Sequence, residues 1–218
     1  MKIHIFGGTF NPPHLAHTQI IQRVNEIIKP DINYIIPALA WQKTNILNAK
    51  NRFEMCELAF DFLDNIVISD IEIKLNKPSY TIETLAKFKH KYPESIIYFT
   101  VGLDQLINIH TWHKWQELTK YANLYIVNRS SLKINKDIYK SIQNTDVKVW
   151  LLNNIKYIYD RISQDTLGSN SIILDDWQPL NISSTQVREL IKQCNWQNLE
   201  SCLALPIINY IVKHNLYS

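Results

Sequence analysis

The segment Lys2–His17, with the sequence KIHIFGGTFNPPHLAH, decides the expected fold. An apolar run typical of a β-strand ends at Gly7–Gly8, and two prolines and then two histidines follow. In a helix that begins near Pro13, His14 and His17 would project from the same face of the first turn. That turn carries backbone N–H groups without intrahelical partners, and glycine lets a phosphate approach the backbone closely. The segment therefore predicts a site for a phosphorylated ligand.

A purely structural interpretation of the same segment stays open at this point. Gly7–Gly8 could form only a tight turn, and Pro-Pro-His could mark only the beginning of a helix. The segment is neither the dinucleotide-binding fingerprint nor the P-loop, because Gly-x-Gly-x-x-Gly and Gly-Lys-Ser/Thr are both absent.

Length and composition limit the function classes. The 218 residues, 46% of them hydrophobic, fit one large domain or two small ones with a sizeable core. The net charge of +3 and the scattered Lys and Arg residues do not indicate nucleic-acid binding. The three cysteines follow neither a metal-ligand spacing nor a disulfide framework, which favours a cytoplasmic protein with reduced thiols. We expect no secretory signal and no membrane span.

Hydrophobic periodicity predicts alternating strands and helices after the first strand. Strands are expected at 32–36, 66–69, 95–101, 124–127 and 171–174, and 71–77 could extend as an edge segment. Helices are expected at 16–28, 52–63, 81–92, 138–143, 182–194, 196–203 and 206–214, with Thr81 as an N-cap and a polar, irregular pattern over 132–170. The run at 95–101 is apolar enough to be buried on both faces, as in a parallel sheet.

This alternation predicts an α/β fold with a doubly wound, mostly parallel sheet, in one domain covering residues 1–218. Its C-terminal part, from about residue 183, is expected to be helical. Ligands of such sheets bind beyond the carboxyl ends of the strands. The segments that follow predicted strands should therefore meet at one edge: Gly7–Gly8, Pro37, Gly102–Asp104 and Asn128–Arg129. We expect Ser183 and Ser184 to join them.

A second candidate segment is Ile182–Arg188, with the sequence ISSTQVR. Three hydroxyl side chains stand where a helix begins, and they could bind an anion together with the free backbone N–H groups. Arg188 lies one turn further and offers a planar set of donors suited to phosphate. The alternative is ordinary helix capping by Ser or Thr, with Arg188 on a solvated face.

Together the two segments resemble the nucleotidyltransferase superfamily that carries His-x-Gly-His and Ser-Ser-Thr-x-x-Arg motifs. Within it, the chain is most similar to the bacterial nicotinate-nucleotide adenylyltransferase family. The matching segments are Gly7–His17, Pro78–Leu85, Gly102–Asp104, Thr111–Trp112, Ile182–Arg188, Leu205–Pro206 and Asn215–Tyr217. The sequence departs from the family at three points: Asn11 replaces an Asp, Ala16 replaces a Gly, and Lys43 stands in an altered loop after the second strand.

The resemblance implies adenylyl transfer from ATP to nicotinate mononucleotide, giving deamido-NAD and pyrophosphate. It assigns His14, His17 and Arg188 to catalysis, by stabilising charge on the ATP phosphates. It assigns further ATP contacts to Gly7, Gly8, Thr9, Phe10, Gly102, Asp104, Ser183 and Ser184. Mg²⁺ is expected to arrive with ATP, and no protein metal site is expected.

The resemblance assigns the mononucleotide to Asn11, Lys43, Thr84, Trp112 and Arg129. Trp112 could stack on the nicotinate ring, and its alternative role is packing. The competing functions are phosphopantetheine or another small-molecule adenylyltransferase, and a nucleotide sensor without turnover. The choice between nicotinate and nicotinamide mononucleotide stays open, as does the oligomeric state, for which a homo-oligomer is one option.

Overall fold

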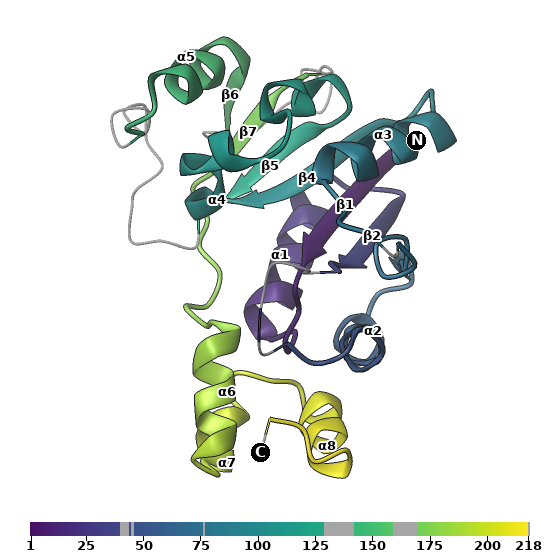
Figure 1. The fold of residues 1–218 in the computed structure, drawn as a ribbon, viewed down its shortest axis with the longest axis vertical. Helices are drawn as coiled ribbons and strands as arrows, with labels where there is room; N and C mark the ends of the chain where they lie inside the picture. The colour runs from purple at the N-terminus through teal and green to yellow at the C-terminus, as the bar shows by residue number, and fades with distance from the viewer. Residues whose placement is uncertain (40–43, 45, 76, 129–141, 159–169, 218) are drawn as a thin grey trace. The chain divides into compact units, whose positions relative to one another are not determined.

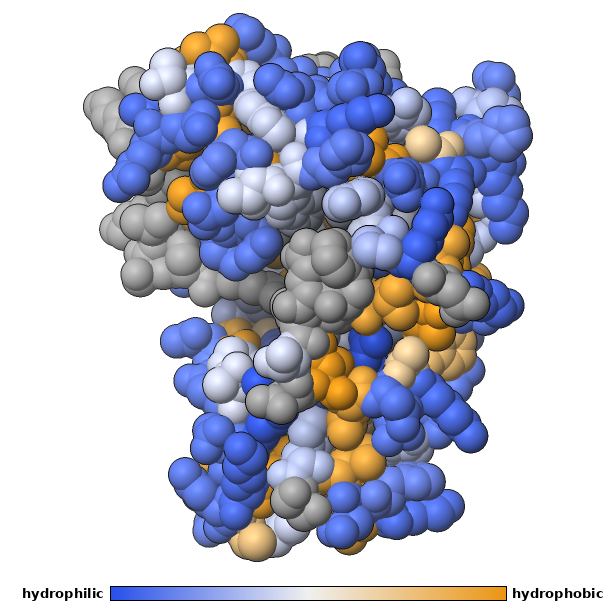
Figure 2. Space-filling model, viewed as in Figure 1, coloured by the Kyte–Doolittle hydropathy of each residue, from blue (hydrophilic) through white to orange (hydrophobic). Residues whose placement is uncertain are grey.

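The computed structural model of the protein describes residues 1–39, 44, 46–75, 77–128, 142–158 and 170–217 (Figure 1). It contains two compact units that interleave in the sequence. The sheet unit comprises Met1–Phe6, Ile28–Ile32 and Ser79–Gln178, and the motif unit comprises Gly7–Ile27, Asn33–Pro78 and Pro179–Ser218. Hydrophilic residues cover much of the face drawn in Figure 2. The prediction of one domain for the whole chain stays a prediction.

The described strands form a sheet in the order β3-β2-β1-β4-β5-β7-β6. They are β1 (Lys2–Gly8), β2 (Ile32–Pro37), β3 (Ile66–Ile68), β4 (Ile96–Gly102), β5 (Asn123–Val127), β6 (Ile155–Ile158) and β7 (Ile172–Asp175). Each pairing of known register is parallel, with Lys2 opposite Ile96 between β1 and β4. Strands are added on one side of β1 from β2 to β3, and the chain then crosses to the other side of β1, where β4 and the later strands pair. This order confirms the doubly wound, mostly parallel sheet.

The sheet unit has its core on the central strands. All five residues of β5 and all four of β7 are buried, as expected for a parallel sheet covered on both faces. His4 of β1 is fully buried, and its Nε2 lies 2.7 Å from the Thr100 hydroxyl of β4, so it has a structural role in the core. The unit also contains α3 (Thr81–Lys91), α4 (Leu103–Ile107), α5 (Thr145–Asn154) and the 3-10 helices η1 (Ile109–Thr111) and η2 (Trp115–Lys120).

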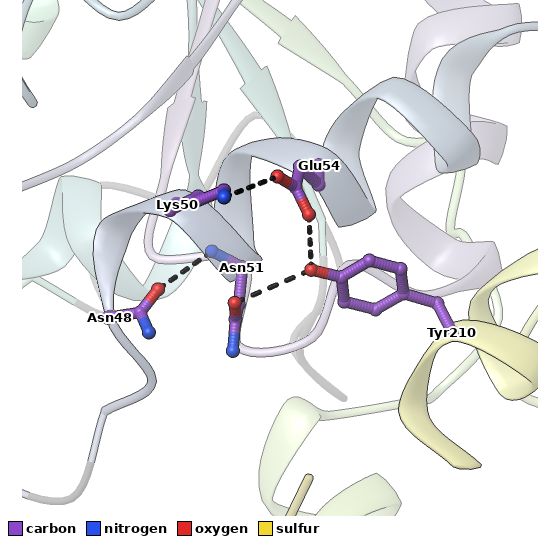
Figure 3. A network of polar contacts seen from close by, with 5 residues as sticks. All are labelled: Asn48, Lys50, Asn51, Glu54 and Tyr210. Carbon is purple, nitrogen blue, oxygen red and sulfur yellow. Dashed lines mark hydrogen bonds and ion pairs between the residues drawn. The ribbon is translucent and has the colours of Figure 1, made fainter. Parts of the chain in front are cut away.

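The motif unit contains β3, most of β2 and five helices among its described residues. These are α1 (Leu15–Ile27), α2 (Ala49–Phe60), α6 (Ser184–Lys192), α7 (Trp196–Leu199) and α8 (Leu205–Lys213). The helix α8 packs against α2, where the Tyr210 hydroxyl donates to Glu54 at 2.5 Å and lies 3.4 Å from Asn51 Oδ1 (Figure 3). The C-terminal helical segment expected from about residue 183 is thus confirmed.

Several expected elements differ from the observed ones. Residues 71–74 form turns rather than an edge strand, because their backbone donors bond locally, as Lys74 N–H does to Asp70 O at 2.9 Å. The helix expected from residue 52 begins at Ala49, since the Asn48 side chain caps it by accepting from Asn51 N–H at 2.8 Å. Thr81 is the first helical residue rather than the N-cap, which is Tyr80.

The largest difference lies in the stretch 132–170. Both α5 and β6 were missed there, and β6 adds an edge strand beyond β7. Of the helix expected at 138–143, residues 138–141 lie outside the described part, and residues 142 and 143 are not helical. The helix expected at 196–203 ends at Leu199, where Ser201 and Cys202 form turns.

Candidate active site

The first half of the candidate site is the start of α1, in the motif unit. The helix begins at Leu15, so His14 is its N-cap residue and His17 its third residue. The two rings lie 3.7 Å apart between centroids, and both residues are at most 6% exposed. The expected pairing of the two imidazoles in one helical turn is therefore observed, although the helix starts later than Pro13.

A backbone contact fixes the orientation of His17. The backbone N–H of His14 donates to His17 Nδ1 at 3.1 Å. An N–H group can only donate, so Nδ1 is the acceptor nitrogen and the proton of the neutral ring is on Nε2. This contact is one half of a capping box, in which the third helical residue reaches back to the N-cap amide. It therefore fixes the tautomer of the ring, with Nε2 as the donor nitrogen.

The second half of the candidate site is the start of α6, also in the motif unit. Ser183 is the N-cap, and its hydroxyl accepts from Gln186 N–H at 3.2 Å. Gln186 Oε1 in turn accepts from the Ser183 backbone N–H at 2.8 Å. This complete capping box is the structural role that the sequence left as an alternative for Ser183. The capping box accounts for the Gln186 N–H, the third N–H of the first turn.

The two helix starts are joined by direct contacts. The Ser184 hydroxyl donates to Pro12 O at 2.9 Å, and Arg188 Nη1 donates to Asn11 O at 2.8 Å. A second guanidinium nitrogen of Arg188 donates to the Thr185 hydroxyl at 3.1 Å. The two motifs, which are far apart in the sequence, therefore lie side by side, and a cation stands next to the loop that precedes His14.

A second arginine, on α2, also holds that loop. Arg52 of α2 is 2% exposed, and its guanidinium donates to the carbonyls of Thr9, Ala38 and Leu47 at 2.8–3.1 Å. Burial lowers the pKa of Arg52 from its ordinary value. Five N–H donors in one plane allow a single arginine to bridge three segments in this way.

Gly7 and Gly8 are the last two residues of β1 rather than a turn, and the packing at Gly8 is tight. A Cβ at Gly8 would lie 2.9 Å from Phe10 Cζ, so a side chain there would displace the ring. Phe10 itself has φ of 47°, in the left-handed region that aromatic residues rarely adopt. Its ring contacts Phe60 and His17 in edge-to-face arrangements, which fix this conformation.

Asn11 and Ala16 are two of the departures from the family pattern. The Asn11 side chain is 3% exposed, and its Oδ1 accepts from Tyr217 Oη at 2.9 Å and from Leu47 N–H at 3.3 Å. These contacts require an acceptor oxygen and no charge, so an amide serves as well as a carboxylate. The Ala16 methyl group is accommodated in the interior, at 2% exposed.

The other predicted site residues lie in the sheet unit or outside the described part. Thr84 is buried on α3, and the Trp112 ring, half-buried, contacts Phe99 edge-to-face. Gly102 is the N-cap of α4, and a Cβ there would lie 2.4 Å from Asp104 Oδ1, so glycine lets that carboxylate fold back over the turn. Lys43 and Arg129 lie outside the described residues. The binding roles of all six stay predictions.

Arg52 and Tyr217 were not assigned to the site from the sequence. Arg52 appeared only as the first residue of an expected helix, and an arginine at a helix start usually faces solvent. Tyr217 carried a weak signal, as part of the C-terminal Asn215–Tyr217 segment shared with the family. Within the described ranges, no three His, Cys, Asp or Glu side chains gather as metal ligands would. No helix in those ranges has the length and apolar character needed to cross a bilayer.

The parallel sheet and the joined helix starts fit an α/β nucleotidyltransferase, which is the class that the comparison with known families supports. Residues 5–190 match the Cytidylyltransferase-like family, which is most of the chain.

Relatives of known name narrow this class. The chain is 36% identical over 175 residues to a probable nicotinate-nucleotide adenylyltransferase of Aliarcobacter butzleri, covering 77% of this chain and 96% of the relative. It is 30% identical to the protein of the same name from Carboxydothermus hydrogenoformans, covering 99% of this chain and 98% of the relative. The chain belongs to the nicotinate-nucleotide adenylyltransferase family.

A solved structure supports the fold at lower sequence identity. The nicotinic acid mononucleotide adenylyltransferase of Plasmodium falciparum, complexed with NaAD, matches with a TM-score of 0.74 at 18% identity. The match covers 99% of this chain and 97% of the other.

Proposed function

We propose that this protein transfers the adenylyl group of ATP to nicotinate mononucleotide, releasing pyrophosphate and forming deamido-NAD. A phosphate oxygen of the mononucleotide attacks the α-phosphorus of ATP, and the bond from that phosphorus to the bridging oxygen of the pyrophosphate breaks. The nucleophile is already an anion, so little base catalysis is required. Positioning and stabilisation of developing charge then account for most of the rate enhancement.

In this proposal the start of α1 binds the reacting phosphate. His17 donates from Nε2 to the charge that develops on the α-phosphate or on the departing pyrophosphate. His14, whose ring lies against that of His17 at a tilt of 31°, takes part in the same contacts. The backbone of Gly7, Gly8, Thr9 and Phe10 lines the approach. The hydrogen bond between the His14 amide and His17 Nδ1 supports this role, because it places the proton of the neutral ring on Nε2.

The start of α6 binds the terminal phosphates. The first turn of a helix offers free N–H groups and the positive end of the helix dipole. Arg188 adds a guanidinium that contacts the loop through one nitrogen and retains further N–H donors for a phosphate oxygen. Since the Ser183 hydroxyl takes part in the capping box, we expect its contribution to come mainly from holding the helix start in shape.

Mg²⁺ enters this reaction with ATP, as part of the substrate. It prefers oxygen ligands and retains several waters. The residues of the candidate site that the structure describes offer imidazole, guanidinium and amide groups and no carboxylate cluster. In this proposal ATP phosphates and water would supply most of the Mg²⁺ ligands.

The observation that carries the proposal is the contact between the two helix starts, through Arg188 and Asn11 and through Ser184 and Pro12. The test is pyrophosphate release from ATP with nicotinate mononucleotide, nicotinamide mononucleotide or 4′-phosphopantetheine, with the dinucleotide product identified by mass. We expect the fastest release with nicotinate mononucleotide. Preference for phosphopantetheine, or ATP binding without release for any acceptor, would contradict the proposal.

Trp112 offers a test of the acceptor site. If its indole ring stacks on the nicotinate ring, Trp112→Ala should raise the KM of the mononucleotide by about tenfold, since such stacking contributes about 1 kcal/mol or more. The KM of ATP should change much less. An equal rise of both constants would instead indicate that Trp112 acts through packing, as its contact with Phe99 would allow.

A further inference from the structure

Four separate segments contact the loop before His14, and two of them bind the side chain of Asn11. Tyr217 of the C-terminal tail and the Leu47 N–H both donate to Asn11 Oδ1, while Arg188 donates to the carbonyl of the same residue. Arg52 holds the carbonyl of Thr9, two positions earlier. Of these contacts, the one from Tyr217 comes from a residue with no other assigned role.

The surroundings of the Tyr217 hydroxyl keep it a donor. Burial raises the pKa of this phenol above its ordinary range, although the guanidinium groups of Arg188 and Arg52 act in the opposite direction. The hydroxyl therefore retains its proton at neutral pH and donates to the amide oxygen of Asn11, a residue that is 3% exposed. A buried hydrogen bond of this kind orients both partners, because leaving either polar group without a partner is unfavourable.

We propose that Tyr217 is a positioning residue for adenylyl transfer, which holds the Asn11 side chain and thereby the loop that places His14 and His17. This inference rests on the proposed function for its kinetic part. The loop contains Pro12 and Pro13 and leads directly into the N-cap of α1, so a change in the orientation of Asn11 moves the N-cap. The contact from the His14 amide to His17 Nδ1 then changes as well.

The chain supplies a matched control for the loss of one tyrosine hydroxyl. Tyr210 is also near the C-terminus and its hydroxyl also joins distant segments, because it donates to Glu54 of α2 (Figure 3). None of its hydrogen bonds in the described part reaches the loop at residues 9–13. Tyr217→Phe and Tyr210→Phe therefore remove the same group from the same unit, and only the first removes a loop contact.

The experiment measures kcat, the KM of ATP, the melting temperature and amide hydrogen exchange for both variants of the full chain. For Tyr217→Phe we expect kcat to fall about tenfold with the KM of ATP changed less than about twofold, since small displacements of reacting groups reduce turnover strongly. Exchange at the Leu47 amide and in the peptide covering Thr9–His17 should accelerate. Tyr210→Phe should change neither kcat nor exchange in these two places.

A double variant sharpens the assignment to Asn11. If Tyr217 acts through Asn11, adding Tyr217→Phe to Asn11→Ala should lower kcat no further, because interacting residues are not additive. Unchanged loop exchange in Tyr217→Phe, or faster exchange with unchanged kcat, would overturn the proposal. The proposal would also be overturned if both tyrosine variants lost kcat simply in proportion to the decrease in their melting temperatures. Exchange is measured without substrate, so a wild-type protein that lacks turnover would refute the proposed function and leave the loop contact testable.

Discussion

At the starts of both α1 and α6, the side chain of the third helical residue accepts a hydrogen bond from the N-cap amide, but the two side chains differ. At α6, Ser183 and Gln186 form a reciprocal capping box, and both side chains bond to the backbone of the helix start. At α1, His17 stands at the helix position that Gln186 has in α6 and also accepts from the N-cap amide, through Nδ1. The imidazole has a second nitrogen, Nε2, which carries the proton of the neutral ring. The same cap geometry is completed by an amide in one helix and by an imidazole in the other, and the proposed function gives only the imidazole a role in catalysis.

The largest expected effect comes from giving α1 the cap of α6. In His17→Gln the amide oxygen can still accept from the N-cap amide, but the imidazole donor is lost. We expect kcat to fall about 10²- to 10³-fold, as for loss of one donor to a developing anion, while the free energy of unfolding changes by less than about 1 kcal/mol.

His17→Ala is the control for that variant, because it removes both the cap and the donor. Steady-state pyrophosphate release and chemical denaturation measure the two quantities. If His17→Gln kept its turnover and only His17→Ala lost stability, His17 would be a capping residue alone, and the difference between the two helix starts would have no catalytic meaning.

The next effect concerns the contact that joins the two starts. Arg188→Ala removes a positive charge and the bond to Asn11 O, so kcat/KM for ATP should fall about 10²-fold. Arg188→Lys should retain only part of the wild-type kcat/KM for ATP, because an ammonium lacks the planar pair of donors. Arg23→Ala is a control on α1, where the guanidinium pairs with Glu26 at 3.6 Å. Equal losses in Arg188→Ala and Arg23→Ala would indicate a general effect of charge.

A smaller expected effect tests whether Ser183 at the start of α6 caps the helix or binds phosphate. Ser183→Ala should lower the free energy of unfolding by about 1 kcal/mol, the usual value for an N-cap, and the melting temperature by about 2–4 °C. The KM of ATP should rise less than about threefold, because the hydroxyl bonds to Gln186. A rise of more than about tenfold at unchanged stability would mean that this hydroxyl binds phosphate directly, as the family resemblance implied.

The smallest effect is a pH dependence away from both helix starts. Burial, the hydrogen bond to Glu54 and the charge of Glu54 raise the pKa of Tyr210 from 10.0 to about 12. A raised folded-state pKa means that this contact contributes fully below pH 10, the unfolded value, and loses its contribution as pH rises through about 12. The difference in unfolding free energy between wild type and Tyr210→Phe should therefore be constant from pH 7 to 9 and shrink above pH 10. A difference that grows with pH would contradict this assignment.

The sequence predicted the elements whose signal is local. The run Ile96–Val101 and the β-branched run at Ile32–Ile36 lie in strands as expected, and the two motifs were recognised as helix starts. The stretch with α5 and β6 was not recognised, because the helix has apolar residues on several sides and the strand has only four residues. Short elements of this kind are stabilised by pairing with neighbours such as β7, which a local pattern does not contain.

The residues of the candidate site could likewise be predicted only where their signal is local in the sequence. His14, His17 and Arg188 could be singled out because their chemistry and spacing are visible in the sequence. Arg52 and Tyr217 could not be assigned, because their roles depend on carbonyl and amide oxygens that folding brings from distant segments. The capping role of Ser183 was foreseen as an alternative, but the tautomer of His17 required the position of the His14 amide.

The most direct test of the central claim is an experimental structure of the protein with a non-hydrolysable ATP analogue. We predict that the α-phosphate lies within hydrogen-bond distance of His17 Nε2, and that the terminal phosphates contact Arg188 and the first N–H groups of α6. A triphosphate bound away from either helix start would contradict it.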